Sequence, residues 1–256
     1  MHPAEECMKH ALVVPILSDD IQRNIESIIS FIDIATKNNA KFIIFPEACL
    51  TGFVTDDTPE HDYKYTVTLD SSYLQQIKEI AYRKVIYLSL GFFERENEHI
   101  YDSVVCISPL GTVIGHYRRQ SPGWHGKNAD KGIYCEGNKV STFSIENCSY
   151  SYLVCGDLFE DDLIAAVKES NPSIVIVPIA RSSDNGSFSQ ELWDIEERPY
   201  YLDQVKKLKA RVLMPNYINE RDNFFGGAYV INSDGIIEKQ KDIYEEGILY
   251  WENGSI

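Results

Sequence analysis

Three reactive or charged residues each stand just beyond an apolar, strand-like run of the sequence. Glu47 follows IIFP, Arg119 comes after VIGHY, and Cys155 follows SYLV. A thiol that attacks carbon, a carboxylate that takes its proton and a cation that stabilises negative charge are the groups needed for covalent catalysis on a carbonyl or nitrile carbon. Because strand ends are rigid and open onto clefts, we expect these three side chains to meet at one site.

Each of the three residues has a simpler explanation when it is taken alone. A cysteine after a strand is most often a small, inert apolar residue. A glutamate after a proline is usually a solvated loop charge, and an arginine beside another arginine usually forms a surface ion pair. The prediction of a site therefore depends on the order and context of the three residues together.

Apolar β-rich runs alternate with amphipathic segments along the chain, which predicts an α/β fold. The first expected helix has Asp19 as its N-cap, with Gln22 at the capping-box spacing and apolar residues every three or four positions. Further helices are expected over 71–84, 159–170 and 199–208. The expected strands are 11–17, 41–45, 85–90, 101–107, 113–117, 140–145, 151–154, 174–177, 212–214, 227–232 and 247–251.

The length of the chain fits one large domain. Its 256 residues, 44% of them hydrophobic, can bury a substantial core, and no repeat or low-complexity linker divides them. We expect a single domain over 1–256, in which 1–10 is a loose N-terminal segment and 245–256 is a C-terminal extension.

Charge and cysteine usage exclude several classes of protein. The net charge of −15 argues against nucleic acid or an anionic membrane as a partner, and the apolar run 11–17 is too short to span a bilayer. Six irregularly spaced cysteines favour free thiols in a reducing compartment, so we expect a cytoplasmic protein. The chain has no CxxC or HxxxH pair, and we expect neither a metal nor a cofactor.

Longer segments around these residues resemble the nitrilase superfamily of carbon-nitrogen hydrolases. KFIIFPEACLTGF resembles the first signature of the family, YSYLVCGDLFED the third, and the resemblance covers nearly the whole chain. It implies a four-layer αββα sandwich of the nitrilase type, with Cys155 as the nucleophile and Glu47 as the base and later the acid. It also implies a small amide, ureido compound or nitrile as substrate, and a homodimer or higher homo-oligomer.

The second signature departs from the family pattern at the residue that completes the catalytic triad. The family has Tyr-Arg-Lys, whereas this chain has Tyr-Arg-Arg at 117–119. Arg119 keeps a positive charge but cannot share a proton, so it either retains the electrostatic role of the lysine or pairs with Glu47 and weakens its basicity. A third option is that Lys127 or Lys131 of the following loop supplies the amine.

Substrate contacts are expected from Gly156, Lys127 and Arg181. Gly156 stands where a bulkier residue is common in the family, and its backbone N–H is a candidate oxyanion donor. Arg181 follows the strand IVIVPIA, where it would either meet a substrate carboxylate or form a salt bridge. Asp157 and Asn216 are expected to brace the site and not to react.

Two functions are compatible with these observations. The first is a carbon-nitrogen hydrolase that cleaves a non-peptide C–N bond through a thioester on Cys155, with Glu47 exchanging protons. The alternative is a catalytically silent protein of the same fold that binds a small amide-like ligand or a protein partner, because Arg119 replaces the lysine. The intact pair of Glu47 and Cys155 favours the first function.

Overall fold

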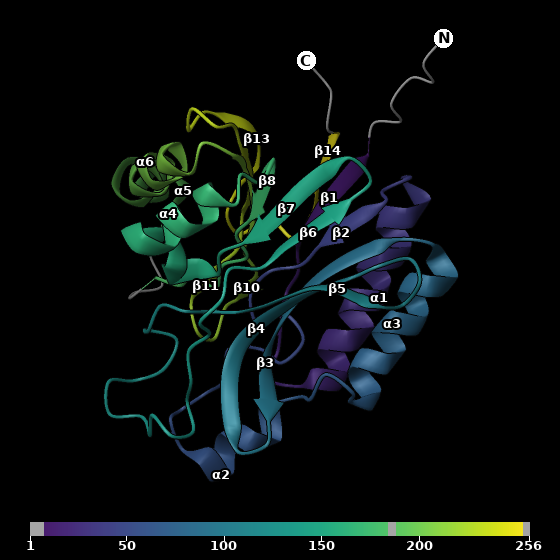
Figure 1. The fold of residues 1–256 in the computed structure, drawn as a ribbon, viewed down its shortest axis with the longest axis vertical. Coiled ribbons are helices and arrows are strands. Elements are labelled where there is room, and N and C mark those ends of the chain that lie inside the picture. The colour runs from purple at the N-terminus through teal and green to yellow at the C-terminus, as the bar shows by residue number, and fades with distance from the viewer. Residues whose placement is uncertain (1–7, 184–187, 253–256) are drawn as a thin grey trace.

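The apolar runs of the sequence form the strands of two six-stranded sheets, which pack face to face with helices on their outer faces (Figure 1). The computed structural model describes residues 8–183 and 188–252. The layers follow the order helix, sheet, sheet, helix, so the predicted four-layer αββα sandwich is confirmed.

The first sheet has the strand order β14-β1-β2-β3-β4-β5. β1, β2 and β3 are parallel neighbours, whereas β4, β5 and β14 join in antiparallel pairs. The strands are β1 (Lys9–Val14), β2 (Phe42–Ile44), β3 (Tyr87–Glu96), β4 (His99–Ile107), β5 (Val113–Arg118) and β14 (Gly247–Glu252).

The second sheet repeats this pattern in the order β13-β12-β9-β8-β7-β6. Its three parallel strands are β7, β8 and β9, and antiparallel strands flank them on both sides. The strands are β6 (Thr142–Ile145), β7 (Cys148–Tyr152), β8 (Ile174–Ile176), β9 (Arg211–Pro215), β12 (Ala228–Ile231) and β13 (Ile237–Lys241).

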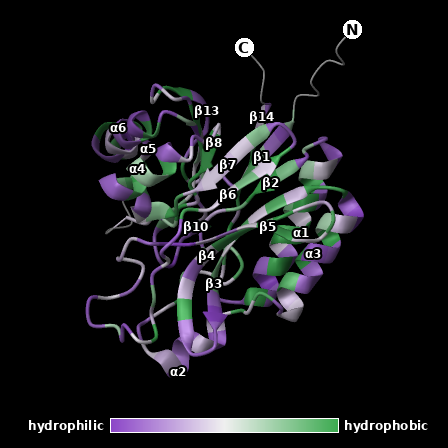
Figure 2. Ribbon diagram, in the orientation of Figure 1, coloured by the Kyte–Doolittle hydropathy of each residue, from purple (hydrophilic) through white to green (hydrophobic). Residues whose placement is uncertain are grey.

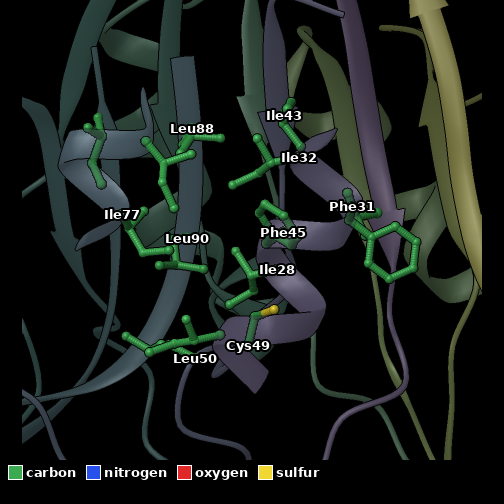
Figure 3. Packing of buried hydrophobic residues seen from close by; sticks show 14 of the residues in the cluster. Ile28, Phe31, Ile32, Ile43, Phe45, Cys49, Leu50, Ile77, Leu88 and Leu90 are labelled. Carbon is green, nitrogen blue, oxygen red and sulfur yellow. The ribbon is translucent and has the colours of Figure 1, made fainter. Parts of the chain in front are cut away.

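Two helices, α1 (Ile21–Lys37) and α3 (Ser72–Lys84), cover the first sheet. Each begins at a side-chain cap, because Asp20 accepts from amides of the first turn of α1 and Ser71 accepts from the Leu74 amide. Figure 3 shows their apolar faces packed against the sheet and the turn after β2, and the labelled residues are Ile28, Phe31, Ile32, Ile43, Phe45, Cys49, Leu50, Ile77, Leu88 and Leu90.

The second sheet is covered by another group of helices. These are α4 (Asp161–Glu169), α5 (Gln190–Leu192), the π-helical turn η3 (Trp193–Glu197) and α6 (Arg198–Leu208). Trp193 and Val205 are buried against this sheet. In Figure 2 the inner sides of α1 and α3 are coloured as hydrophobic, whereas their outer turns and the arrow end of β3 are hydrophilic.

The remaining short elements lie outside the two sheets. α2 (Pro59–Asp62) and the 3₁₀ turn η1 (Tyr63–Tyr65) follow β2, and the hairpin of β10 (Ile218–Asn219) and β11 (Phe224–Phe225) follows β9. The long loop between β5 and β6 extends toward α2 (Figure 1), and the Tyr134 hydroxyl of this loop donates to the Asp62 carboxylate at 2.6 Å.

Three expectations about the ends of elements need correction. The N-cap of α1 is Asp20 and not Asp19, because the Asp20 side chain is the one that accepts from the Gln22 amide at 2.8 Å. Residues 247–252 are not a separate extension, since they pair with β1 as the edge strand β14. The expectation of a loose segment over 1–10 is wrong for Lys9 and His10, which belong to β1. Residues 1–7 lie outside the described residues.

Within 8–183 and 188–252, none of the helices has the length and apolar character needed to cross a membrane. No disulfide joins the cysteines in this part of the chain.

Candidate active site

Glu47 lies in the turn that follows β2, close against the middle of β3. A Cβ at Gly91 of β3 would come within 2.6 Å of the Pro46 carbonyl oxygen and 2.8 Å of the Glu47 Cα, so only glycine allows the turn to pack there. Ala48 takes up a left-handed φ of 49°, which completes the sharp turn. The Glu47 carboxylate is buried as a result, with a relative exposure of 1% for the residue.

Arg119 directly follows β5 and continues its pairing with β4, because its amide donates to the Asp102 carbonyl at 2.8 Å. Strand alternation places Arg119 on the inner side, whereas Arg118 points outward and pairs with Glu94. The two adjacent arginines therefore have different surroundings, and only Arg119 reaches Glu47.

The guanidinium of Arg119 is buried and held by four groups. Its Nη1 donates to Oε1 of Glu47 at 3.0 Å and lies 3.6 Å from Oδ2 of Asp102. Its Nε donates to the Ser121 hydroxyl at 3.0 Å, and its Nη2 donates to the Pro122 carbonyl at 3.4 Å. One cation thus faces two buried carboxyl groups.

Cys155 opens the 3₁₀ turn η2 (Cys155–Phe159), just after β7. Its φ of 47° lies in the left-handed region, a strained conformation for a residue with a Cβ. The Cys155 amide donates to the Pro178 carbonyl at 3.0 Å, which holds the turn against the end of β8. Cys155 and Gly156 keep part of their surface open, and no hydrogen bond from the Gly156 amide is found among the described residues.

Asp157 joins the cysteine turn to the segment that carries Arg119. Its buried carboxylate accepts from the Val154 amide at 3.0 Å and from the Tyr117 hydroxyl at 2.7 Å. It also accepts from the amides of Gln120 at 3.1 Å and Ser121 at 2.6 Å. The expected bracing role of Asp157 is thus present in the structure, and it connects two of the three candidate residues.

The charges of the site act on one another. Burial and the Glu47 charge raise the pKa of the Cys155 thiol to about 12, while Arg119 opposes this rise. Burial alone would lower the pKa of Arg119, but Cys155 in its ionised form and the Glu47 charge raise it above its ordinary value, so this side chain stays a cation. A thiol with this pKa is protonated at neutral pH and needs a base to become a nucleophile.

The expected substrate contacts lie in different places. A Cβ at Gly156 would meet Nη2 of Arg119 at 2.5 Å, so this residue belongs to the site. Arg181 donates to both oxygens of Glu197 at 2.9 Å, which is the salt-bridge alternative, and its amide is held by Asn216. Lys127 is exposed.

The structure gives the positions of the two loop lysines that were expected as possible sources of the missing amine. Lys127 and Lys131 are exposed on the loop between β5 and β6. Among the described residues, neither amine forms an ion pair or hydrogen bond with Glu47 or Cys155. The structure therefore does not bring these lysines to the Cys155 thiol. The cation that acts on this thiol is Arg119.

Three residues of the site do not follow from the strand-end pattern. They are Asp102, Tyr217 and Ser121, whose hydroxyl accepts from Arg119. The buried Tyr217 hydroxyl has no hydrogen-bond partner in the described chain, and the Glu47 charge acts on it. The sequence contains a sign of Asp102, because this charged residue comes two positions before the buried Val104 and so lies on the same buried face of the strand.

Asp56, His61 and Asp62 place potential metal ligands within 4.8 Å of one another. The Asp62 carboxylate already accepts from the Asp56 amide at 3.0 Å and the Tyr134 hydroxyl at 2.6 Å, and it contacts the His61 ring at 2.7 Å. These internal hydrogen bonds explain the cluster without an ion.

Comparison with known proteins agrees with the fold. The carbon-nitrogen hydrolase family model matches residues 13–252. An amidase from Nesterenkonia sp. superposes with a TM-score of 0.77 at 18% identity, covering 96% of this chain and 90% of that protein. A carbon-nitrogen hydrolase from Helicobacter pylori G27 superposes with a TM-score of 0.79 at 15% identity, covering 96% and 88%.

Curated relatives match over shorter shares of their own length. A glutamine-dependent NAD(+) synthetase from Acinetobacter baylyi is 24% identical over 239 residues, which are 91% of this chain and 41% of that protein. A cyanide hydratase from Stereum hirsutum is 28% identical over 141 residues, 49% of this chain and 36% of that protein. The chain thus spans less than half of the length of these relatives. It belongs to the carbon-nitrogen hydrolase family.

Proposed function

We propose that this protein is a carbon-nitrogen hydrolase that cleaves a non-peptide C–N bond of a small amide, ureido compound or nitrile. Cys155 is the nucleophile, Glu47 the base and acid, and Arg119 the cation of the site. The observation that carries the proposal is the convergence of these three side chains from distant strand ends, with Cys155 in a strained turn. Cyanide hydratases among the relatives fit the nitrile alternative.

In the first half of the reaction with an amide, Glu47 takes the thiol proton of Cys155 as sulfur bonds to the carbonyl carbon. Negative charge develops on the carbonyl oxygen, where the Gly156 amide and the Arg119 guanidinium are the available donors. Glu47 then returns the proton to the leaving nitrogen as the C–N bond breaks. Ammonia or an amine departs and a thioester remains on Cys155.

In the second half, water attacks the thioester carbon while Glu47 accepts its proton. The C–S bond breaks, the carboxylic acid leaves, and the proton of Glu47 returns to the sulfur, so that the resting site is restored. Roles of Lys127 and Arg181 in holding the substrate stay predictions.

A panel of small amides, ureido acids and nitriles tests this function. We expect at least one compound to release ammonia, amine or acid, and Cys155→Ala to abolish this release. Glu47→Gln should lower kcat by roughly 100-fold or more, because it removes the proton-transferring group. The thioester should be found on Cys155 by mass spectrometry after rapid acid quenching. Absence of turnover across the panel, together with no adduct on Cys155, would contradict the proposal.

The silent alternative is favoured by one observation, the 3.0 Å pair between Arg119 and Glu47. This pair occupies one oxygen of the carboxylate that the proposed reaction needs as its base. If the wild type is silent for this reason, Arg119→Lys should create turnover on the same panel. A wild type that is active, with Arg119→Lys changing only its rate, would exclude the silent alternative.

We also propose that the protein is cytoplasmic and forms a homodimer. Supporting the dimer, Ile195 and Tyr200 are 66% and 68% exposed on the outer helices of the second sheet, where large apolar side chains are costly to leave in water. Light scattering on the wild type and on an Ile195→Asp/Tyr200→Asp variant should show a dimer that the variant loses. A monomeric wild type at micromolar concentration would contradict it.

A further inference from the structure

Asp102 differs from the other buried aspartates in lacking hydrogen-bond donors. Asp157 and Asp62 each accept from at least two backbone amides and from a tyrosine hydroxyl, so their oxygens have donors. Both oxygens of Asp102 are buried without a donor in the described part of the chain, and the nearest cation, Nη1 of Arg119, lies 3.6 Å from Oδ2. An ionised carboxylate in this position would be strongly destabilised.

Within the described residues, one oxygen of the Glu47 carboxylate also lacks a hydrogen-bond donor. Its Oε1 accepts from Arg119 at 3.0 Å, but its Oε2 is buried without a donor. The carboxyl groups of Glu47 and Asp102 face each other as hydrogen-bond partners, yet two ionised carboxylates have no hydrogen to place between them. A single proton in this position would give both groups a partner.

The charge balance of the site leads to the same conclusion. Within 8–183 and 188–252, Arg119 is the one cation in contact with the two carboxyl groups, and the Asp157 charge also acts on Asp102. With one proton on the pair, one positive charge faces one negative charge. Burial, followed by the Glu47 charge, raises the pKa of Asp102 well above its ordinary value, and Arg119 opposes this only in part.

We propose that Glu47 and Asp102 share one proton in the resting protein, and that Asp102 is a positioning residue which holds the Glu47 carboxylate beside Cys155. The neutral Asp102 donates to Oε2 of Glu47 while Arg119 donates to Oε1, so the carboxylate is held from both sides. Its catalytic consequence rests on the proposed function, whereas the shared proton itself does not. When Glu47 takes the thiol proton, the Asp102 carboxyl group remains neutral and adds no charge that repels the thiolate.

Infrared spectroscopy detects the shared proton without any substrate. Protein labelled with ¹³C in the aspartate carboxyl groups should show, at neutral pH, an isotope-sensitive C=O band of a protonated carboxyl group. Asp102→Asn should remove this band, and the matched control Asp62→Asn should leave it in place, because the Asp62 carboxyl group accepts from two backbone amides and the Tyr134 hydroxyl. No such band in the wild type, or a band that survives in Asp102→Asn, would overturn the proposal.

Two variants at position 102 separate positioning from a merely structural role. Asparagine keeps a neutral donor for Glu47, so Asp102→Asn should retain the thermal stability of the wild type and kcat within a few-fold. Asp102→Ala leaves Oε2 of Glu47 without a partner, and kcat should fall roughly 100-fold with little change in KM. Equal loss of stability and kcat in both variants would overturn the proposal. An inactive wild type would reject the proposed function but not the shared proton. The infrared band and the stability of Asp102→Asn test the shared proton without any turnover.

Discussion

The guanidinium of Arg119 occupies the space beside Gly156 that a side chain would need. A Cβ at position 156 would lie 2.5 Å from Nη2 of Arg119 and 3.0 Å from the Ser121 hydroxyl. The site therefore accommodates the larger cation because residue 156 has no side chain. This contact connects the two positions at which the resemblance implies other residues, a lysine at 119 and a bulkier residue at 156.

Gly156→Ala should displace Arg119 from Glu47 and lower both the stability and any turnover. We expect a loss of roughly 1–3 kcal/mol in the free energy of unfolding, as overpacking of a buried site produces. Because a lysine is narrower, the Arg119→Lys/Gly156→Ala double variant should lose less than the sum of the single variants, with a coupling of about 1 kcal/mol. Urea denaturation of the four proteins measures this cycle.

Gly132→Ala is the matched control for this cycle. Gly132 lies in the loop between β5 and β6, and its added Cβ would meet only the Asp130 carboxylate at 3.2 Å. It should leave the stability nearly unchanged. Strict additivity of the Arg119 and Gly156 substitutions would show that the two residues do not compete for space.

Most of the fold follows from the sequence because strand and helix periodicity are local signals. The apolar run at 41–45 predicts a strand and the stripe of isoleucines in α1 predicts a helix; the structure confirms both, with the strand at Phe42–Ile44. A strand is also expected over 247–251, but its pairing with β1 could not be inferred in the same way, because that pairing joins residues at opposite ends of the chain. Short elements such as α2 have too few residues for a periodic pattern.

The candidate site is only partly visible in the sequence for a related reason. Strand ends identify Glu47, Arg119 and Cys155, and alternation along β5 separates Arg119 from Arg118. The partners that set their charges come from other strands. Asp102 of β4 meets Glu47 through a tertiary contact that no spacing in the sequence encodes.

Arg119→Met should destabilise the protein strongly, because it leaves the buried Glu47 carboxylate without its cation. We expect a loss of about 3–5 kcal/mol in the free energy of unfolding, the usual effect of removing one partner of a buried pair. Glu47→Gln/Arg119→Met should recover much of this loss, since the neutral amide has no unpaired charge. The control Arg83→Met removes an exposed pair with Glu79 and should have little effect. Equal effects of the two arginine substitutions would contradict this prediction.

His10 should make the folded state sensitive to mild acid. Its ring is buried between the sheets, with Nδ1 3.0 Å from the Met8 carbonyl and Nε2 2.9 Å from the Tyr150 hydroxyl. Burial lowers the pKa of His10 from 6.5 to about 4, although the hydrogen bond to the Met8 backbone opposes this shift. The unfolded chain therefore binds this proton first, and the stabilising contribution is present above pH 6.5 and lost as the pH falls toward 4.

The expected loss from His10 is about 3 kcal/mol between these pH values. Urea denaturation at several pH values measures it, and His10→Gln provides the control because glutamine does not titrate. The variant should be less stable near pH 7 and should lose less stability on acidification. An identical pH dependence in both proteins would show that His10 is not the responsible group.

Asp157→Ala should loosen the cysteine turn and the Arg119 segment together. The substitution leaves the amides of Val154 and Ser121 and the Tyr117 hydroxyl without their acceptor. We expect a loss of about 3 kcal/mol or more in the free energy of unfolding, since each buried donor left unpaired costs about 1–3 kcal/mol. Asp161→Ala, which changes an exposed residue on the neighbouring helix, should have little effect. If both substitutions have the same small effect, Asp157 does not hold these segments together.

The alkylation rate of Cys155 should report the charges beside it. With a thiol pKa of about 12, the free protein should react slowly with iodoacetamide at pH 7, and the rate should rise steadily toward alkaline pH. Glu47→Gln removes a negative charge that raises this pKa, so it should speed alkylation at a given pH. Arg119→Met removes the opposing cation and should slow it.

Peptide mapping by mass spectrometry assigns the alkylation to Cys155. Cys49 and Cys106 are fully buried and serve as internal controls, because their modification would show that a variant has opened. The comparison therefore uses only conditions under which these two thiols stay unmodified. If Glu47→Gln and Arg119→Met shift the Cys155 rate in the same direction, the two side chains do not act on the thiol through opposite charges, and the electrostatic account of the site is wrong.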